Sequence, residues 1–294
     1  MSSALRVPAA SSIPVGIEVR PPRWLSFLVL LFAGLLLFEL AFFALKGGGK
    51  VFQVATFIAL PITYSIVAAL LRKSRRFATY WPAFFSYAAA SIALFSVWLL
   101  DELPARWLGL NAKTPPAMAV GKVTDALLVL LTVILLNRSF GVSLGSVFLQ
   151  KGKLGLGLIV GFAGFLAMAA FGIFESRDMG VSTNQLLAFA PWLLTFVLAN
   201  GFFEELLFRG LFLRKFEPLV GPRLANVVTA LVFTIGHAGV TYTADVLAFL
   251  VVTLVFALIW GYVMQKTNGL WASSLFHAGA DVVIMIGIFA GVKL

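Results

Sequence analysis

Long apolar runs, separated by short polar stretches, make up most of the chain. A helix needs about 20 apolar residues to cross the roughly 30 Å hydrocarbon core of a bilayer. No series of alternating ten-residue segments, which would indicate a β-barrel, accompanies the runs. The pattern therefore predicts an all-α protein, a polytopic transmembrane helix bundle of eight or nine spans. The candidate spans lie at 24–45, 51–71, 81–100, 119–136, 154–174, 187–207, 225–243, 246–264 and 269–291.

Two of these runs are irregular. The fourth begins with Lys122 and Asp125, which we expect to pair because they lie about one helical turn apart. The sixth continues into residues 208–216, which we expect to form a separate short helix. Glycines at the start of the fifth run, between 152 and 164, are interpreted as points of close helix packing, because small residues let membrane helices approach one another.

Basic residues in the polar stretches indicate an orientation. The N-terminal segment contains Arg6, Arg20 and Arg23, and the apolar run after it is too long for a signal peptide. With nine spans and this segment inside, most of the 22 Lys and Arg residues fall on the inner side. The positive-inside rule then predicts a multi-pass protein of the cell (inner) membrane with a cytoplasmic N-terminus.

Composition supports the membrane prediction and excludes several other classes. Hydrophobic residues make up 61% of the chain and charged residues only 12%, which rules out a soluble globule, a disordered chain and collagen. The chain has no cysteine, so disulfides, thiolate metal sites and cysteine nucleophiles are excluded. The net charge of +10 is assigned to polar loops and lipid headgroups, and nucleic acid is not an expected partner.

Polar residues of the kind that carry chemistry gather in the last third of the chain. Ionisable groups inside a bilayer are costly, so each is a candidate for function. Glu39 and Asp125 are isolated in the earlier spans and are interpreted as structural. Both histidines of the chain belong to later clusters. The three clusters are Asn200-Gly-Phe-Phe-Glu204-Glu205-Leu-Leu-Phe-Arg209-Gly210, Phe233-Thr-Ile-Gly-His237 and His277-Ala-Gly-Ala-Asp281.

Helical spacing assigns different roles to the two glutamates. Glu205 and Arg209 are four residues apart and share a helix face, so we expect an ion pair that braces the site. Glu204 is turned by about 100° from Glu205, toward Asn200, and remains the free carboxylate that suits a general base. A solvated charge pair at a helix end is the alternative.

The two histidines have neighbours at the same spacing. Asp281 is placed either to orient His277 or to face a common point with it, and Phe233 is the expected packing partner of His237. Hydrogen-bonded core histidines are the alternative interpretation.

The three clusters resemble a known family. Phe203-Glu204-Glu205-Leu-Leu-Phe-Arg209-Gly210 is similar to the EExxxR motif of the CAAX-protease and bacteriocin-processing (CPBP, or Abi) family of intramembrane endopeptidases. Phe233-x-x-x-His237 resembles its second motif, His277-x-x-x-Asp281 its third, and Asn268-Gly-Leu-Trp-Ala-Ser-Ser-Leu-Phe-His277 the usual approach to the third. The resemblance covers about residues 185–291.

The resemblance implies an intramembrane protease. Glu204 would activate the water with the help of His237, His277 and Asp281 would complete the catalytic set, and Glu205, Arg209, Asn200 and Phe233 would support it. We divide the chain accordingly into a polar cytoplasmic segment (1–23), N-terminal transmembrane helices (24–180) and a catalytic transmembrane core (181–294).

Metal dependence is open at the level of sequence. Glu204, His237, His277 and Asp281 form a credible zinc set, because zinc accepts imidazole and carboxylate ligands. The third motif often ends in Asn, whereas here it ends in Asp281, which binds metals better but cannot donate to an oxyanion when ionised. The alternative is a glutamate-type enzyme without a cofactor, in which Asp281 holds His277 in one tautomer.

Other functions remain possible on the sequence. A bacteriocin-immunity or scaffolding membrane protein of the same fold would lack catalysis. A transporter would show inverted repeats and ionisable residues along a path, which are not apparent. The expected partners are the lipid bilayer and a membrane-bound or lipidated protein or peptide substrate, whose identity the sequence does not define.

Overall fold

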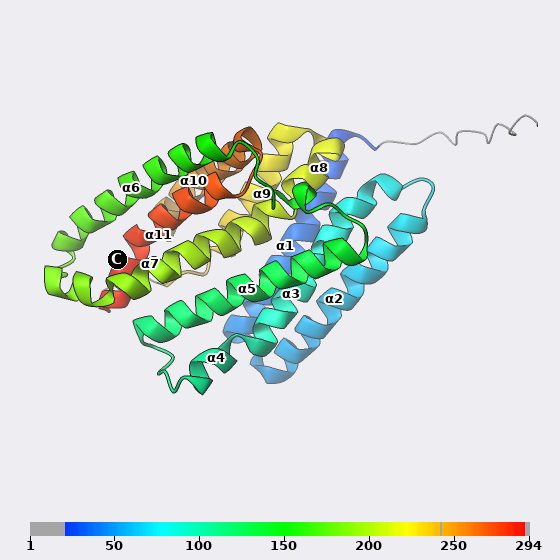
Figure 1. The fold of residues 1–294 in the computed structure, drawn as a ribbon. Helices are drawn as coiled ribbons and strands as arrows, with labels where there is room; N and C mark the ends of the chain where they lie inside the picture. Colours follow the sequence, from blue (N-terminus) through cyan, green and yellow to red (C-terminus); the bar gives the residue numbers. More distant parts are fainter. Residues whose placement is uncertain (1–20, 242, 292–294) are drawn as a thin grey trace, which may run out of the picture.

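The computed structural model describes residues 21–241 and 243–291, and within these ranges it is helical without strands (Figure 1). The expectation for residues 1–20 therefore lies outside the described part, and the division of the chain at residue 180 stays a prediction. The elements are α1 (Arg23–Gly47), α2 (Gly49–Lys73), η1 (Ala78–Tyr80), α3 (Trp81–Leu100), α4 (Glu102–Trp107), α5 (Pro115–Ser139), η2 (Leu144–Val147), α6 (Leu154–Asp178), α7 (Thr183–Glu204), the π-turn η3 (Glu205–Gly210), α8 (Leu213–Val220), α9 (Pro222–Gly236), α10 (Val246–Thr267) and α11 (Trp271–Ala290).

Eight of the described helical segments are long and apolar enough to cross a membrane, which confirms the predicted all-α bundle. The predicted seventh span, 225–243, is wrong in its extent, because α9 ends at Gly236. Its 15 residues span only about 22 Å at 1.5 Å per residue. The chain continues without a helix, and the Gly239 carbonyl accepts a 2.8 Å hydrogen bond from Lys46 at the end of α1. The path from α9 thus still reaches the opposite end of the bundle.

The predicted short helix after the sixth span also begins later than expected. α7 ends at Glu204 and continues into the π-turn, in which the Leu211 amide donates to the Leu206 carbonyl five residues back, at 3.0 Å. The separate helix, α8, starts only after this turn. Gly221 ends it with φ of 87°, a left-handed value that a residue with a side chain rarely adopts.

Buried helices form the centre of the bundle, and exposed apolar side chains cover its outer surface. α11 and α3 are the most buried of the long helices. In Figure 1, α11 (red) lies between α6, α7 and α10, and α2, α3 and α5 lie side by side. α6 is turned outward over most of its surface, with Ile159 and Leu166 exposed by 70% and 63%. Apolar side chains at such positions suit hydrocarbon rather than water.

Glycines allow α11 to approach its neighbours closely, as predicted for the fifth run. A Cβ at Gly161 would lie 2.9 Å from Leu275, and one at Gly164 would lie 2.5 Å from Phe276. On the other side of α11, a Cβ at Gly201 of α7 would lie 2.5 Å from the Ser274 carbonyl oxygen. That atom is backbone and cannot rotate away, so α7 and α11 require glycine at this contact.

Basic residues gather at one end of the bundle. The helix ends that meet there carry Arg23, Arg72, Arg138, Lys153 and Lys266, and we call this the basic end. Contacts join these helix ends: Arg72 of α2 lies over the rings of Trp81 and Phe140, at the start of α3 and the end of α5.

Candidate active site

The three polar clusters of the sequence meet inside the bundle, close to the basic end. His277 lies six residues after Trp271, the first residue of α11, or about 9 Å along the helix axis. Glu204 is the last residue of α7, beside the contact that Gly201 makes with α11. The π-turn then carries Glu205 and Arg209, and all six of its residues are buried. Single π-turns within helices are frequent at functional sites.

Glu205 and Arg209 form the predicted ion pair in the interior. Arg209 Nη1 donates to Glu205 Oε1 at 2.6 Å, and both side chains are fully buried. Arg209 Nε donates to the Ala257 carbonyl at 3.3 Å, and the guanidinium lies over Phe233 with its carbon 4.5 Å from the ring centroid. Removing either charge would leave the other buried and unpaired, at a cost of about 3–5 kcal/mol. The pair therefore braces α7, α9 and α10 against one another.

His277 joins this brace to the free carboxylates. Its Nδ1–H donates to Glu205 Oε1 at 2.9 Å, while its Nε2 lies 3.4 Å from Glu204 Oε2 and 3.5 Å from Asp281 Oδ1. The Nδ1 bond fixes the orientation of the ring, because a carboxylate accepts a hydrogen bond only from a protonated nitrogen. A proton on Nε2 would satisfy both neighbouring carboxylates. The residue that orients His277 is therefore Glu205, where spacing alone pointed to Asp281.

Asp281 has a partner of its own. Asn200 Nδ2 donates to Asp281 Oδ2 at 3.0 Å, so α7 supplies the group that holds this carboxylate from its far side. Asn200 thus contacts Asp281 in place of Glu204, and its supporting role stays a prediction. Exposure differs among the acidic side chains: 16% for Glu204 and 12% for Asp281, against none for Glu205. Only the first two carboxylates are reachable by water.

Trp260 of α10 is a component that sequence reasoning missed. Its indole stacks on the His277 imidazole with ring centroids 3.9 Å apart and planes within 9°. The Arg209 guanidinium lies on the same ring system, 5.4 Å from the centroid. Trp260 is 4% exposed, so it fixes one face of His277 without access to water. The sequence gives little signal for it, because an aromatic residue within an apolar span is usually a packing residue.

The Phe233 ring lies between His237 and His277. Its Nδ1–H donates to the Phe233 carbonyl at 2.8 Å, and its ring lies 4.4 Å from the Phe233 ring by centroids. The Phe233 ring in turn meets His277 edge-on, at 5.7 Å. His237 follows α9 directly and so lies deeper from the basic end than His277. The predicted packing of Phe233 on His237 is confirmed, and the same ring separates the two histidines.

Comparison with known protein families matches one part of the chain. Residues 186–283 match the family model described as Rce1-like, type II CAAX prenyl endopeptidase Rce1-like. We call these residues, which are similar to that family, the Rce1-like region. Comparisons with curated proteins and with solved structures gave no significant match. The match covers about a third of the chain and confirms the resemblance that the three sequence motifs indicated.

Every member of the site lies inside the Rce1-like region. The matched residues begin in α7 and end in α11, so they include both glutamates, both histidines, Arg209 and Asp281. The eight apolar helices indicate a multi-pass membrane protein, and its matched region is similar to type II CAAX prenyl endopeptidases. α6, which lies before the matched region, packs along α11 and completes its burial.

The Rce1-like region does not present the predicted zinc set as a metal-binding group. Among residues 21–241 and 243–291, no three His, Asp or Glu side chains are arranged so that they could hold a metal ion. Nδ1 of His277 is used by Glu205 and Nδ1 of His237 by the Phe233 carbonyl, and the Phe233 ring separates the imidazoles. As arranged, these residues do not fit a zinc ion, and metal dependence stays a prediction.

Proposed function

We propose that the protein is an intramembrane endopeptidase that hydrolyses a peptide bond of a membrane-associated or lipidated protein or peptide, with a water activated by Glu204. The observation that carries the proposal is the unequal setting of the two adjacent glutamates. Glu205 is buried between Arg209 and His277, whereas Glu204 is partly exposed and lies 3.4 Å from His277 Nε2. The Rce1-like match supports the same class of reaction.

The proposed reaction proceeds in successive steps, each carried out by a named residue. Glu204 takes a proton from the water, whose oxygen attacks the carbonyl carbon of the substrate. His277 donates its Nε2 proton as a hydrogen bond to the oxygen that becomes negative, and the Glu205 bond to Nδ1 holds the ring in that orientation. Collapse of the tetrahedral intermediate breaks the C–N bond, and Glu204 returns its proton to the leaving amine. Asp281 lies beside Nε2 and favours a proton there.

Two features position these steps at a membrane surface. The site lies about 9 Å inside the basic end by the helix rise, within reach of a substrate anchored in the same leaflet. We propose that the basic end faces the cytoplasm, since basic residues are retained on that side.

The test compares Glu204→Gln with the wild-type protein in purified, lipid-reconstituted form. The substrates are fluorescence-quenched peptides with a membrane anchor, presented with and without a prenyl group. We expect Glu204→Gln to lower cleavage by about 10²–10⁴-fold, the usual contribution of a general base, while the melting temperature stays within about 2 °C of wild type.

A matched control is available at Glu217, a partly buried carboxylate of α8 whose Oε1 accepts from Gln265. Glu217→Gln should leave cleavage unchanged. Full activity of Glu204→Gln would contradict the proposal. No cleavage of any peptide by wild type, in a preparation that melts cooperatively, would favour a non-catalytic immunity or scaffolding role.

A further inference from the structure

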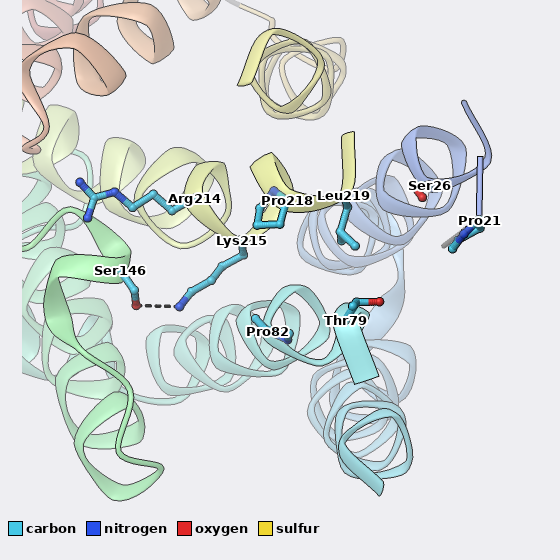
Figure 2. A pocket seen from close by; sticks show the side chains of 9 residues that line it. All are labelled: Pro21, Ser26, Thr79, Pro82, Ser146, Arg214, Lys215, Pro218 and Leu219. Carbon is cyan, nitrogen blue, oxygen red and sulfur yellow. Dashed lines mark hydrogen bonds between the residues drawn. The ribbon is translucent and has the colours of Figure 1, made fainter. Parts of the chain in front are cut away.

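A cavity lies at the basic end, on the side of α8 away from α11. It has a volume of about 350 Å³ and opens between α1, the start of α3, η2 and α8 (Figure 2). Its wall is mostly apolar. The residues that line it are Pro21, Ser26, Thr79, Pro82, Ser146, Arg214, Lys215, Pro218 and Leu219.

Lys215 places an ammonium group in this wall without a matching carboxylate. Its Nζ donates to Ser146 Oγ at 2.6 Å, and Figure 2 shows the side chain reaching from α8 to η2 along the cavity. Within the described ranges no Asp or Glu oxygen lies within 4.0 Å of it. A half-buried cation that keeps only a hydroxyl partner gains from an anion beside it.

The neighbouring charged groups act in both directions: Arg214 increases the positive field, and Glu217 partly offsets the charge of Arg214. Arg214 adds a second cation, and its guanidinium is held by the Gly145 carbonyl, the Asn268 side chain and the face of Phe148. None of these partners is an anion. Glu217, two residues after Lys215, accepts a hydrogen bond from Gln265 at 2.8 Å.

The place and shape of the cavity define the ligand further. Its residues lie at the starts of α1 and α3 and on the short elements η1, η2 and α8, at the end of the bundle where spanning helices leave the hydrocarbon core and meet the headgroup layer. Pro82, Pro218 and Leu219 also line the cavity and give it an apolar wall (Figure 2). A ligand that fits both parts has an anionic head and an adjoining apolar portion.

We propose that this cavity binds a phosphate ester, with Lys215 at the phosphate oxygens and the apolar wall against the glycerol and first acyl carbons. Ser146 positions the ammonium group, because its oxygen accepts from Lys215 while its hydroxyl donates to the Ser143 carbonyl. A membrane phospholipid supplies this chemistry, and so does a water-soluble phosphate monoester such as glycerol 3-phosphate. The site is separate from the candidate catalytic residues, and the proposal does not depend on proteolysis.

The experiment measures lipid retention by native mass spectrometry of the full-length protein in a phosphate-free detergent. The probes are phosphatidylglycerol and a diacylglycerol with the same acyl chains, which lacks the phosphate. We expect wild type to retain phosphatidylglycerol at least tenfold better than diacylglycerol. Lys215→Gln should remove that preference, Lys215→Arg should keep most of it, and Ser146→Ala should weaken it about threefold.

Lys266→Gln is the matched control, because it removes an exposed basic residue from the same end of the bundle. It should retain phosphatidylglycerol like wild type. Equal retention by Lys215→Gln and Lys266→Gln, or no preference for phosphatidylglycerol in wild type, overturns the proposal. Melting curves without lipid check that Lys215→Gln is folded, and Lys215→Arg keeps the test decisive if it is not.

A competition arm identifies the source of the phosphate. Glycerol 3-phosphate at millimolar concentration is added to the wild-type complex with phosphatidylglycerol. Retention of the lipid supports a phospholipid site. Displacement, together with a rise in melting temperature that Lys215→Gln lacks, supports a site for a soluble phosphate ester.

Discussion

Two ion pairs within apolar helices look alike in sequence but differ in the structure. Lys122 and Asp125 of α5 are 3.1 Å apart, with side chains exposed by 19% and 13%. Glu205 and Arg209 are 2.6 Å apart and fully buried. The decisive difference is a third partner: the Glu205 oxygen that binds Arg209 also accepts from His277 on another helix. A carboxylate that pairs within one helix stabilises that helix, whereas a carboxylate that also binds a group on a second helix fixes the geometry of a site.

The largest effect is expected when the fully buried pair, Glu205 and Arg209, is broken. Glu205→Gln leaves Arg209 buried without its counter-charge, and the neutral amide oxygen accepts from His277 more weakly than the carboxylate does. We expect the free energy of unfolding to fall by about 3–5 kcal/mol, together with a loss of most cleavage activity. Chemical or thermal unfolding in lipid, alongside the peptide assay, measures both. Normal stability of this variant would show that the brace has no energetic role.

Asp281→Asn should act on activity more than on stability. The amide keeps the size of the side chain, but the negative charge beside His277 Nε2 is lost, so we expect cleavage to fall by about tenfold to a hundredfold. The assay is run with and without a chelator, and metal content is measured on the purified protein. Loss of both metal and activity in the variant would identify Asp281 as a metal ligand. A variant that keeps this reduced activity, together with a chelator-resistant wild type, fits a role of Asp281 in favouring the proton on His277 Nε2.

Trp260 provides a finer test of the shared geometry. Trp260→Leu removes the ring that stacks on His277, and we expect kcat to fall about tenfold with little change in KM, because the imidazole loses its fixed plane. Trp260→Phe keeps an aromatic face and should restore most of the rate. A purely structural role predicts less folded protein with unchanged kcat per folded molecule.

The smallest effect is expected at the partly exposed pair, Lys122 and Asp125. Asp125→Asn should lower the free energy of unfolding by less than Glu205→Gln does, because its side chain keeps 13% exposure whereas that of Glu205 has none, with cleavage within about threefold of wild type. A loss as large as that of Glu205→Gln would remove the distinction between the two pairs. Lys122 lies over the Phe203 ring, 4.7 Å from its centroid, so the same variant also tests whether α5 affects the neighbouring Glu204.

Spacing along helices predicted much of this arrangement and failed where several helices meet. The pairing of Glu205 with Arg209 needs only one helix, and it was predictable. The bond from His277 to Glu205 depends on how closely α7 approaches α11, which Gly201 permits. The π-turn was also beyond prediction, because tertiary packing selects it over an α-helical turn of the same sequence.

The prediction of the helices likewise succeeded where one segment decides the outcome and failed where several segments meet. Apolar length located the long helices, since a single run decides each one. It misplaced the end of α9, where the pattern stays apolar after Gly236 while the backbone leaves the helix at His237. Little in the sequence pointed to Trp260. Its contact with His277 joins two helices, and each helix is predicted from its apolar run alone.

The order of the helices has a consequence for synthesis of the protein. An arginine at the centre of an inserting helix costs about 2.5–3.5 kcal/mol on insertion scales, and Glu205, in the same segment as Arg209, can neutralise it before later helices exist. His277 and Asp281 arrive only with α11, after all the other described helices. A nascent chain therefore carries Glu204 without its partners, and the hydrolytic centre forms only when α11 has entered the bundle.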